Sequence, residues 1–147
     1  MRVMEPELIF KIANTVALAG WVLLIFLPVA RITQILLFGL VIPLLLAVTY
    51  VGLIGLYIGQ AEGGFGSLMD VALLFQHPQI LLAGWVHYLC FDLMIGVWES
   101  ADARKCGISR WIVAPCQILT FLFGPAGMLA YVIVRTVHTR QYPPEFP

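Results

Sequence analysis

The sequence predicts an all-α fold: an integral membrane four-helix bundle with a short interfacial helix between the second and third spans. Of its 147 residues, 61% are hydrophobic and 11% are charged, and so few polar side chains cannot cover the surface of a soluble domain of this size. The charged residues also leave four uncharged segments of 19, 30, 21 and 24 residues, and a helix needs ~20 mostly apolar residues to cross the hydrocarbon core. We therefore predict one transmembrane domain, residues 1–147, with spans near 9–29, 35–58, 80–98 and 111–134.

The charge balance and the cysteines exclude several classes of protein. Eight Lys and Arg balance eight Asp and Glu, whereas a nucleic-acid-binding protein shows a basic excess. The low charged fraction excludes a soluble enzyme and a disordered tail. The cysteines, Cys90, Cys106 and Cys116, are odd in number and widely spaced, which fits neither a disulfide framework nor a CxxC metal site. The sequence has no nucleotide, zinc-protease or c-type haem motif, so it indicates no cofactor and no nucleic-acid partner.

The first two predicted spans are joined by a short connection. Residues 9–29 exceed the ~7–15-residue core of a signal peptide and lack a small-residue cleavage site, so we expect this helix to be retained. Within residues 35–58, Pro43 removes a backbone hydrogen bond that neighbouring helices or side chains must replace in lipid. Gly55 and Gly59 are four residues apart, a spacing that lets helices approach closely. We expect this contact inside the bundle, with dimerisation as the alternative.

The connection before the third span contains the sequence GGFGSLMDVALLFQHP. Its three glycines suit a loop, after which Ser67 can cap a short helix that runs to Phe75, with Asp70 at the third helical position. Apolar residues recur at i, i+3, i+4 and i+7 in this segment. The helix is therefore expected to lie in the membrane interface or over the bundle mouth, with a packed surface turn as the alternative. Pro78 fits the first position of the third helix.

The third span contains the residues on which a function can rest. Asp92 lies mid-span, where a carboxyl group costs ~2.5–3.5 kcal/mol on the insertion scale and normally faces the bundle interior with a partner. On a helix, Trp85 and Tyr88 share the face of Asp92, and Glu99 returns to that face seven residues later. His87 lies about 140° around the helix from Asp92, so the two flank one cavity only if most of the helix is buried. The alternative for both residues is a purely structural hydrogen bond.

The partner of Asp92 is expected on another span. The available polar side chains are Asn14 in the first span and Gln117 and Thr120 in the fourth. The sequence GPAG around Pro125 interrupts the fourth span. This break either opens a cavity beside the third span or produces a kink with only packing consequences.

Two further acids, Glu99 and Asp102, lie where the third span leaves the membrane, next to Arg104 and Lys105. We expect surface ion pairs among these four side chains. A hard-cation site needs several oxygen ligands that converge, and no recognised ligand spacing is present. No metal-binding residue is therefore assigned, and metal binding by Glu99 and Asp102 is left open.

Four spans place both chain ends on one side of the membrane. The Lys and Arg residues then divide four against four between the two sides, so the positive-inside rule gives no orientation. Residues 141–147 contain three prolines and are expected to form a flexible tail.

Four longer stretches carry a distinctive set of motifs: ANTVALAGWVLLIFLP, GGFGSL, GWVHYLCFDLMIGVWESADARKCGI and ILTFLFGPAGMLAYVIVR. The most specific parts are HYLxFDLxxGxW…DAxxxGI and LTFLFGPxG. In these motifs the chain resembles the abscisic-acid-deficient-four-like family over residues 14–135. Plant members are plastid membrane proteins needed to make neoxanthin, so the resemblance implies a carotenoid or other isoprenoid ligand.

The resemblance also implies a reaction. Conversion of violaxanthin to neoxanthin is an isomerisation that needs an acid at the epoxide oxygen and a base for a proton, with no redox cofactor. We therefore expect a cofactor-independent carotenoid isomerase, performing neoxanthin-synthase-like epoxide opening or cis–trans isomerisation, with Asp92 as base or orienter and His87 or Tyr88 as acid. The candidate substrate-binding residues are Asn14, Trp85, Gln117, Thr120 and Pro125.

Two other functions stay open. The protein can bind a carotenoid or isoprenoid without converting it, or it can be an interaction subunit whose Gly55/Gly59 face meets a membrane enzyme or a second copy. No Ser/Arg-rich transit peptide precedes the first span. We therefore expect a multi-pass protein of the bacterial cytoplasmic (inner) membrane, surrounded by membrane lipids.

Overall fold

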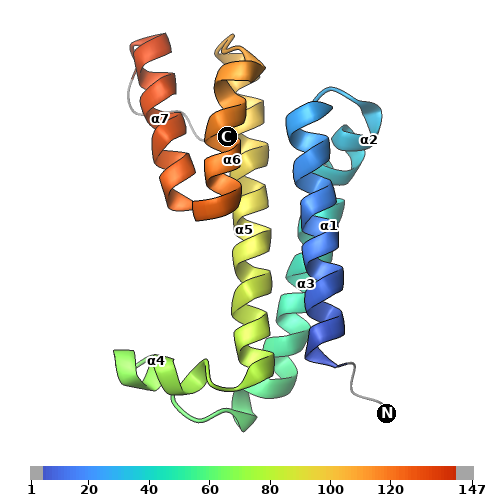
Figure 1. Ribbon diagram of the computed structural model, residues 1–147, viewed down its shortest axis with the longest axis vertical. Helices are drawn as coiled ribbons and strands as arrows, with labels where there is room; N and C mark the ends of the chain where they lie inside the picture. Colours follow the sequence, from blue (N-terminus) through green and yellow to red (C-terminus); the bar gives the residue numbers. More distant parts are fainter. Residues whose placement is uncertain (1–4, 142–147) are drawn as a thin grey trace.

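The computed structural model describes residues 5–141 and is helical, with no strand in that range (Figure 1). The predicted tail, residues 141–147, lies outside the described residues except for Gln141. The helices in chain order are α1 (Pro6–Phe26), α2 (Arg31–Thr33), the π-helix η1 (Gln34–Phe38), α3 (Val41–Tyr57), the 3₁₀ turn η2 (Ile58–Gln60), α4 (Leu68–Leu74), α5 (Pro78–Lys105), α6 (Arg110–Phe123) and α7 (Pro125–Thr139).

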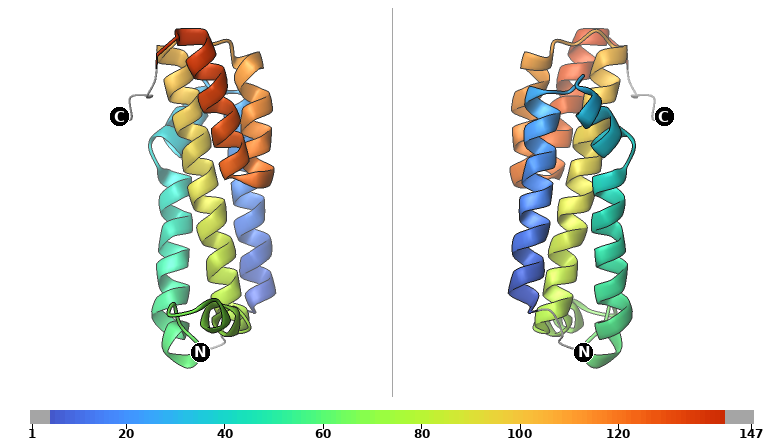
Figure 2. Two further views of the ribbon diagram at one scale, coloured as in Figure 1. Left: turned by 90° about the vertical axis from the view of Figure 1, so that its left-hand side faces the viewer. Right: turned by 90° about the vertical axis from the view of Figure 1, so that its right-hand side faces the viewer.

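Three long helical segments form the body of the protein, with α5 between α1 and α3 (Figure 2). The segments Pro6–Phe26, Arg31–Gln60 and Pro78–Lys105 contain 21, 30 and 28 residues and are long and apolar enough to cross a membrane. The first three predicted spans fall on these segments. Helix α5 alone is about 42 Å long at 1.5 Å per residue, so it can reach both interfaces.

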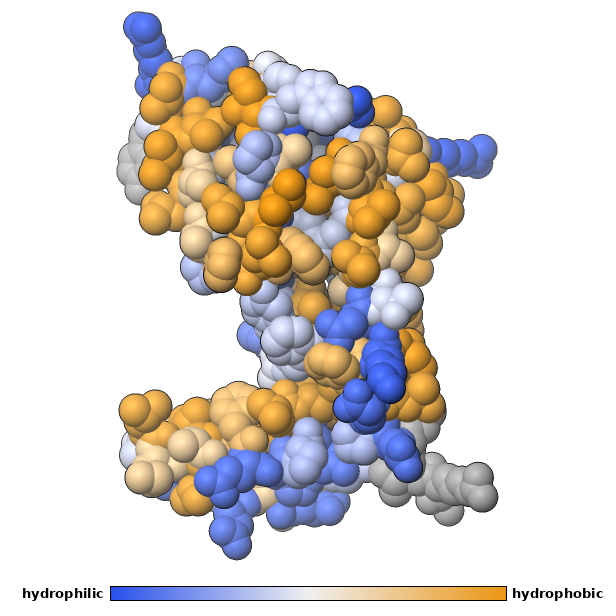
Figure 3. Space-filling view, viewed as in Figure 1, coloured by the Kyte–Doolittle hydropathy of each residue, from blue (hydrophilic) through white to orange (hydrophobic). Residues whose placement is uncertain are grey.

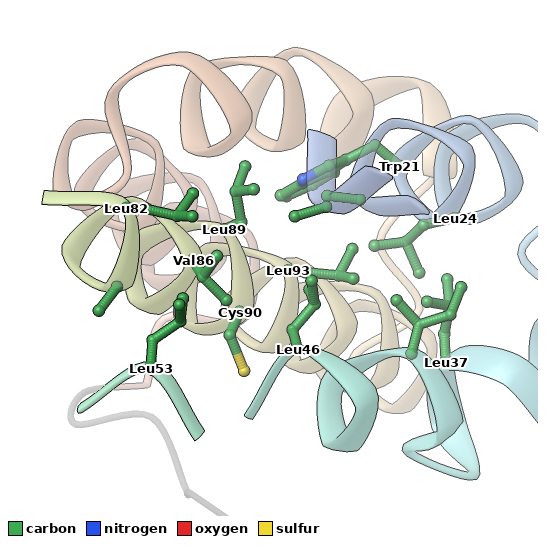
Figure 4. Packing of buried hydrophobic residues seen from close by; sticks show 14 residues of the cluster. Trp21, Leu24, Leu37, Leu46, Leu53, Leu82, Val86, Leu89, Cys90 and Leu93 are labelled. Carbon is green, nitrogen blue, oxygen red and sulfur yellow. The ribbon is translucent and has the colours of Figure 1, made fainter. Parts of the chain in front are cut away.

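The core lies where α1 and α3 pack against α5 (Figure 4). The ring of Trp21 lies against Gly96, where an added Cβ would come within 2.5 Å of the indole. Leu93 is fully buried and packs over Gly20 on the facing side of α1. Small residues at these crossings bring the helix backbones close together, which is how helices associate in lipid.

The second helical segment is interrupted near its start. The π-helix η1 ends at Gly39, and Leu40 takes a left-handed conformation with φ 61° before α3 begins. Pro43 is therefore the third residue of α3, in the first turn, where a backbone N–H has no helical acceptor. The expectation that Pro43 removes a backbone hydrogen bond of the second span is wrong, because the helix is interrupted before Pro43 and α3 begins only two residues earlier.

The small-residue stripe along α3 and η2 does not contact another helix in the described structure. A Cβ placed on Gly52, Gly55 or Gly59 would meet no atom within 4 Å. The expected contact inside the bundle is therefore wrong, since these glycines face outward.

The short helix predicted between the second and third spans is α4, which lies across one end of the bundle (Figure 1). As predicted, Ser67 caps it: its Oγ accepts a hydrogen bond from the backbone N–H of Asp70 at 3.1 Å, and Pro78 opens α5. Leu68 and Met69 are 87% and 70% exposed. Such exposed apolar side chains suit a helix at the membrane interface.

The predicted fourth span, residues 111–134, is not one crossing helix. Helices α6 and α7 pack side by side and run in opposite directions, and the chain reverses at Gly124 (Figure 1). Gly124 has φ +45°, a conformation that a residue with a Cβ rarely adopts, and Pro125 then begins α7. The four-helix bundle is thus replaced by three long helices and a hairpin, α6–α7, that enters from one end and returns to it.

This reversal separates the two ends of the described chain. Helix α1 begins at the end that carries α4, and α7 ends at the other, which we call the hairpin end (Figures 1 and 2). The expectation of both termini on one side is wrong for residues 5–141. Of the described basic residues, Lys11 lies toward the α4 end, and the others lie at the hairpin end: Arg31, Arg104, Lys105, Arg110, Arg135 and Arg140.

The uneven distribution of the described Lys and Arg residues between the two ends predicts an orientation in the membrane, whereas the four-span arrangement, with four basic residues on each side, predicted none. Because short loops rich in Lys and Arg stay in the cytoplasm, we expect the hairpin end to be cytoplasmic and the α4 end to face the opposite compartment. In a bacterial host, a fluorescent protein fused after Gln141 should fold and fluoresce, and an epitope inserted between Gly63 and Gly64 should be cut by external protease. A chain that crosses four times would place both reporters on the same side.

Candidate functional site

The α6–α7 hairpin covers only part of one face of α5. Toward the hairpin end, Trp98 on this face packs edge-on against Tyr131 of α7, with ring centroids 5.3 Å apart. Seven residues earlier, on the same face, Phe91 is 55% exposed. Figure 3 shows the resulting hollow between the hairpin and α4. We call this hollow, bounded by the hairpin tip, the middle of α5 and α4, the notch.

Asp92 lies where the covered part of α5 meets the notch. Its side chain is mostly buried, with 8% of the residue exposed, and its carboxyl group lies directly against the hairpin tip. A Cβ on Gly124 would come within 2.8 Å of Oδ1 and 3.1 Å of Oδ2. In the described structure Oδ2 has no hydrogen-bond partner. The adjacent start of α7 contributes the positive end of a helix dipole, which favours a negative group.

Tyr88 is the polar neighbour of Asp92, as the shared helix face indicated. Its hydroxyl donates a hydrogen bond to the backbone carbonyl of Phe121 at 2.9 Å, and the same hydroxyl interacts with the Asp92 carboxyl group. Tyr88 therefore joins α5 to the last turn of α6 immediately beside the acid. The structure brings together Asp92, Tyr88 and the hairpin tip that Pro125 begins.

His87 lies on the Phe91 side of α5, about 140° around the helix from Asp92. Its ring packs against Tyr50 of α3 and Phe91, at centroid distances of 5.5 and 4.6 Å. It lines a cavity of about 220 Å³ between α3, α4 and α5. The angular separation from Asp92 expected from the sequence is thus what the structure has.

Trp85 and Asn14 form a second polar contact, one that joins α5 to α1. The indole Nε1–H of Trp85 donates to Asn14 Oδ1 at 3.1 Å. Trp85 also lines an apolar cavity of about 520 Å³ at the α4 end of the bundle. The cavity is bounded by residues of α1, α5 and the end of α4, including Phe10, Phe75, Leu81 and Gly84. Trp85 is seven residues, about 10 Å along the helix axis, from Asp92.

Thr120 and Gln117, the predicted partners of Asp92 in the fourth span, form hydrogen bonds with other groups. Thr120 Oγ1 donates to Glu99 Oε1 at 2.7 Å, and Gln117 Nε2 donates to the carbonyl of Gly96 at 3.2 Å. Neither bonds to Asp92 in the described structure. Glu99 is fully buried, and its Oε2 has no hydrogen-bond partner among the described residues. Thr120 and Gln117 therefore fix the hairpin on α5.

The expected surface ion pairs of Glu99 and Asp102 are wrong, because the hairpin buries both acids. Asp102 Oδ2 accepts hydrogen bonds from Arg135 Nε at 2.8 Å and from the Tyr131 hydroxyl at 2.6 Å. Arg135 is 4% exposed, so this is a buried ion pair between α5 and α7. The sequence clue was that Glu99 shares the face of Asp92. The position of Arg135 was hidden by the assumption of a continuous fourth span.

The buried acids have protein partners. Asp102 is held by Arg135 and Tyr131, and Glu99 by Thr120. Within residues 5–141, no group of three or more His, Cys, Asp or Glu side chains comes together in an arrangement that could hold a metal ion. We therefore assign Glu99 and Asp102 to the attachment of the hairpin.

Comparison with known proteins identifies the family. A family model described as ABA4-like, ABA DEFICIENT 4-like, matches residues 8–131, a range that contains Asp92, Tyr88 and the hairpin tip. No curated protein and no solved structure matches the chain. The match does not bear out the expected bacterial origin, which stays a prediction. Since the matched range covers most of the sequence and three helical segments can cross a membrane, the chain is a membrane protein that belongs to the ABA4-like family.

Proposed function

We propose that this protein is a cofactor-independent isomerase of a carotenoid or similar polyene, with the reaction taking place at Asp92. The observation that carries the proposal is the position of this carboxyl group. It is buried against the hairpin tip, has an unbonded oxygen, and adjoins a notch that opens at the side of the long helices (Figure 3). An intramembrane acid is by default a functional residue, and here its polar neighbour is the Tyr88 hydroxyl. Family membership supports the choice of ligand class.

The apolar surroundings support a long hydrocarbon ligand. The cavity beside Trp85, about 520 Å³, has the size of a small-molecule site, and its walls are almost entirely apolar side chains. A polyene with one end group in this cavity can extend along α5 through the notch. Its polar or strained group then comes to Asp92 and Tyr88, about 10 Å further along the helix. Entry from the side, out of the bilayer, requires no passage through water.

The chemistry requires one proton to be given and one to be taken. In epoxide opening, an acid protonates the epoxide oxygen as its C–O bond breaks, and a base removes a proton from a nearby carbon. The products are an allene and an alcohol, with no net oxidation. We assign Asp92 as base or orienter and Tyr88 as the acid in preference to His87, because the Tyr88 hydroxyl lies beside Asp92 and His87 packs against Tyr50. Such acid–base groups each contribute about 10²–10⁴-fold.

The test is the pigment profile of cells that accumulate one defined carotenoid. Expression of the wild-type protein should convert part of the pigment to an isomer. Asp92→Asn, which keeps the shape and removes the charge, should lower conversion by about 10²–10⁴-fold. Glu62→Gln, which removes an acid from the connection before α4, should convert as well as the wild type. Full conversion by Asp92→Asn would remove Asp92 from this role.

A second candidate is a protein that binds a carotenoid or isoprenoid without converting it. The apolar cavity at Trp85 favours it. In that case pigment would co-purify unchanged, and Trp85→Ala would release it while Asp92→Asn would not.

A third candidate, an interaction subunit of a membrane enzyme, is favoured by the outward-facing Gly52, Gly55 and Gly59. This face would meet another helix closely, whether of a partner enzyme or of a second copy. Gly55→Leu would then abolish co-purification of that partner and leave any bound pigment in place.

A further inference from the structure

The hairpin end has a basic surface with no exposed acid among the described residues. Arg31, Arg104, Lys105, Arg110 and Arg140 are all exposed there. The acids of the same region, Glu99 and Asp102, are buried under the hairpin. Asp102 already neutralises Arg135. The exposed arginines of this end therefore lack counter-ions within the described chain.

Two of these arginines border a small pocket between the end of α1, the end of α5 and the start of α6. The pocket has a volume of about 130 Å³, and Arg104 and Arg110 both line it. Ser100 and Gln117, which are 8% and 3% exposed, also line it and present polar atoms. Other walls are apolar, among them Leu24, Ile25 and Val113. The pocket thus combines two cationic side chains with an apolar wall.

Both guanidinium groups are held in place by aromatic rings. Arg104 lies 4.4 Å from the ring centroid of Phe38, and Arg110 lies 4.5 Å from that of Trp111. Arg110 also donates a hydrogen bond to the carbonyl of Phe26 at 3.5 Å. Neither arginine has an acidic partner in the described structure. A pre-positioned guanidinium is well suited to bind phosphate oxygens, because it offers several N–H donors in one plane.

We propose that this pocket binds the phosphate of an anionic phospholipid, with its headgroup at Arg104 and Arg110 and an acyl chain along the apolar wall of α1 and α6. The pocket lies where helices end and where exposed Phe26 and Trp111 mark the interface, which is the depth of lipid phosphates and of aromatic belts. A free phosphate would use the two arginines but not the apolar wall. The proposed reaction site, Asp92, lies at the tip of the hairpin beside Gly124, whereas this pocket lies at the start of α6. The inference therefore does not depend on the proposed reaction.

The test uses the full chain, purified in mild detergent and examined by native mass spectrometry with added lipid. The wild type should retain phosphatidylglycerol in preference to phosphatidylcholine. The double variant Arg104→Gln/Arg110→Gln should bind phosphatidylglycerol on the order of tenfold more weakly. The matched control Arg31→Gln/Arg140→Gln removes the same charge from the same end outside the pocket and should stay within about twofold of the wild type.

Further arms distinguish the site from its alternatives. Arg104→Gln/Arg110→Gln should unfold at the wild-type temperature, which separates loss of the site from loss of the fold. Arg104→Lys/Arg110→Lys keeps the charge but loses the planar donor group, and it should bind phosphatidylglycerol more strongly than the Gln variant and more weakly than the wild type. Equal losses in the pocket and control variants would overturn the proposal in favour of diffuse attraction. Displacement of phosphatidylglycerol by equimolar inorganic phosphate would also overturn it, because a free anion would then be the ligand.

Discussion

Arg135→Met should lower the free energy of unfolding by about 3–5 kcal/mol, the usual result of removing one partner of a buried ion pair. Arg135 and Asp102 are 4% and 5% exposed, and the guanidinium is the one cation that contacts this carboxylate in the described structure. Without it, Asp102 would keep the Tyr131 hydroxyl and the weakly donating Cys106 thiol as hydrogen-bond donors, with no charge to balance its own. The hairpin should then detach from α5. Unfolding in mixed micelles of detergent and dodecyl sulfate, followed by circular dichroism, measures the change.

Two companion variants isolate the cause. Arg140→Met removes an exposed arginine one turn further along the chain and should change stability by less than about 0.5 kcal/mol. Asp102→Asn/Arg135→Met removes both charges together and should recover much of the loss, because no unpaired buried charge is left. If Arg135→Met unfolded like the wild type, Arg135 would not be buried against α5.

Gly127→Val should open the hairpin. A Cβ on Gly127 would overlap the backbone of Thr120 on the facing helix, and the backbone cannot rotate out of the way as a flexible side chain can. We expect a loss of about 3 kcal/mol or more, at the upper end of what overpacking costs. The hydrogen bond from Thr120 to Glu99 should also be lost, because it depends on the position of α6.

The matched control is Gly52→Val on α3, where an added Cβ meets no atom within 4 Å. The same substitution there should leave stability within about 1 kcal/mol of the wild type, since only helix propensity changes. Both variants are compared by the same micelle titration. Equal stability of Gly127→Val and Gly52→Val would mean that α6 and α7 do not pack at Gly127.

The long helices were predictable because they depend on composition and length. The charge-free segments around Trp21, Pro43 and Leu82 are long enough to cross a membrane whatever their neighbours are. The cap at Ser67 was also predictable, because a cap is formed by residues three apart in the chain.

The hairpin could not be predicted in the same way. The sequence around Gly124 and Pro125 indicates a break in the helix, but the same residues suit a kink and a full reversal. The reversal is stabilised by contacts that the local sequence does not show. These are the close packing of Gly127 on Thr120 and the ion pair of Arg135 with Asp102, 33 residues earlier in the chain. Because the sequence predicts one crossing helix in place of α6 and α7, it also predicts both termini on one side of the membrane and Glu99 at the surface.

The candidate site was predictable in part. Helix geometry placed Tyr88 beside Asp92, and His87 about 140° around the helix from Asp92, since these relations lie within one helix. It did not find that the hairpin tip at Gly124 touches the acid, or that Thr120 bonds to Glu99 and not to Asp92. Those contacts depend on which helices pack together, and the residue pattern within one helix does not show this.

We propose that Asp92, under the hairpin tip, reacts with a polyene that enters the notch from the membrane. An assay that supplies purified protein in liposomes with an epoxycarotenoid can measure bound pigment and initial conversion rate on the same sample. We expect the wild type to bind and convert the pigment, and Asp92→Asn to bind comparably while converting about 10²–10⁴-fold more slowly. Equal conversion by the two proteins, or binding with no conversion by the wild type, would contradict the claim.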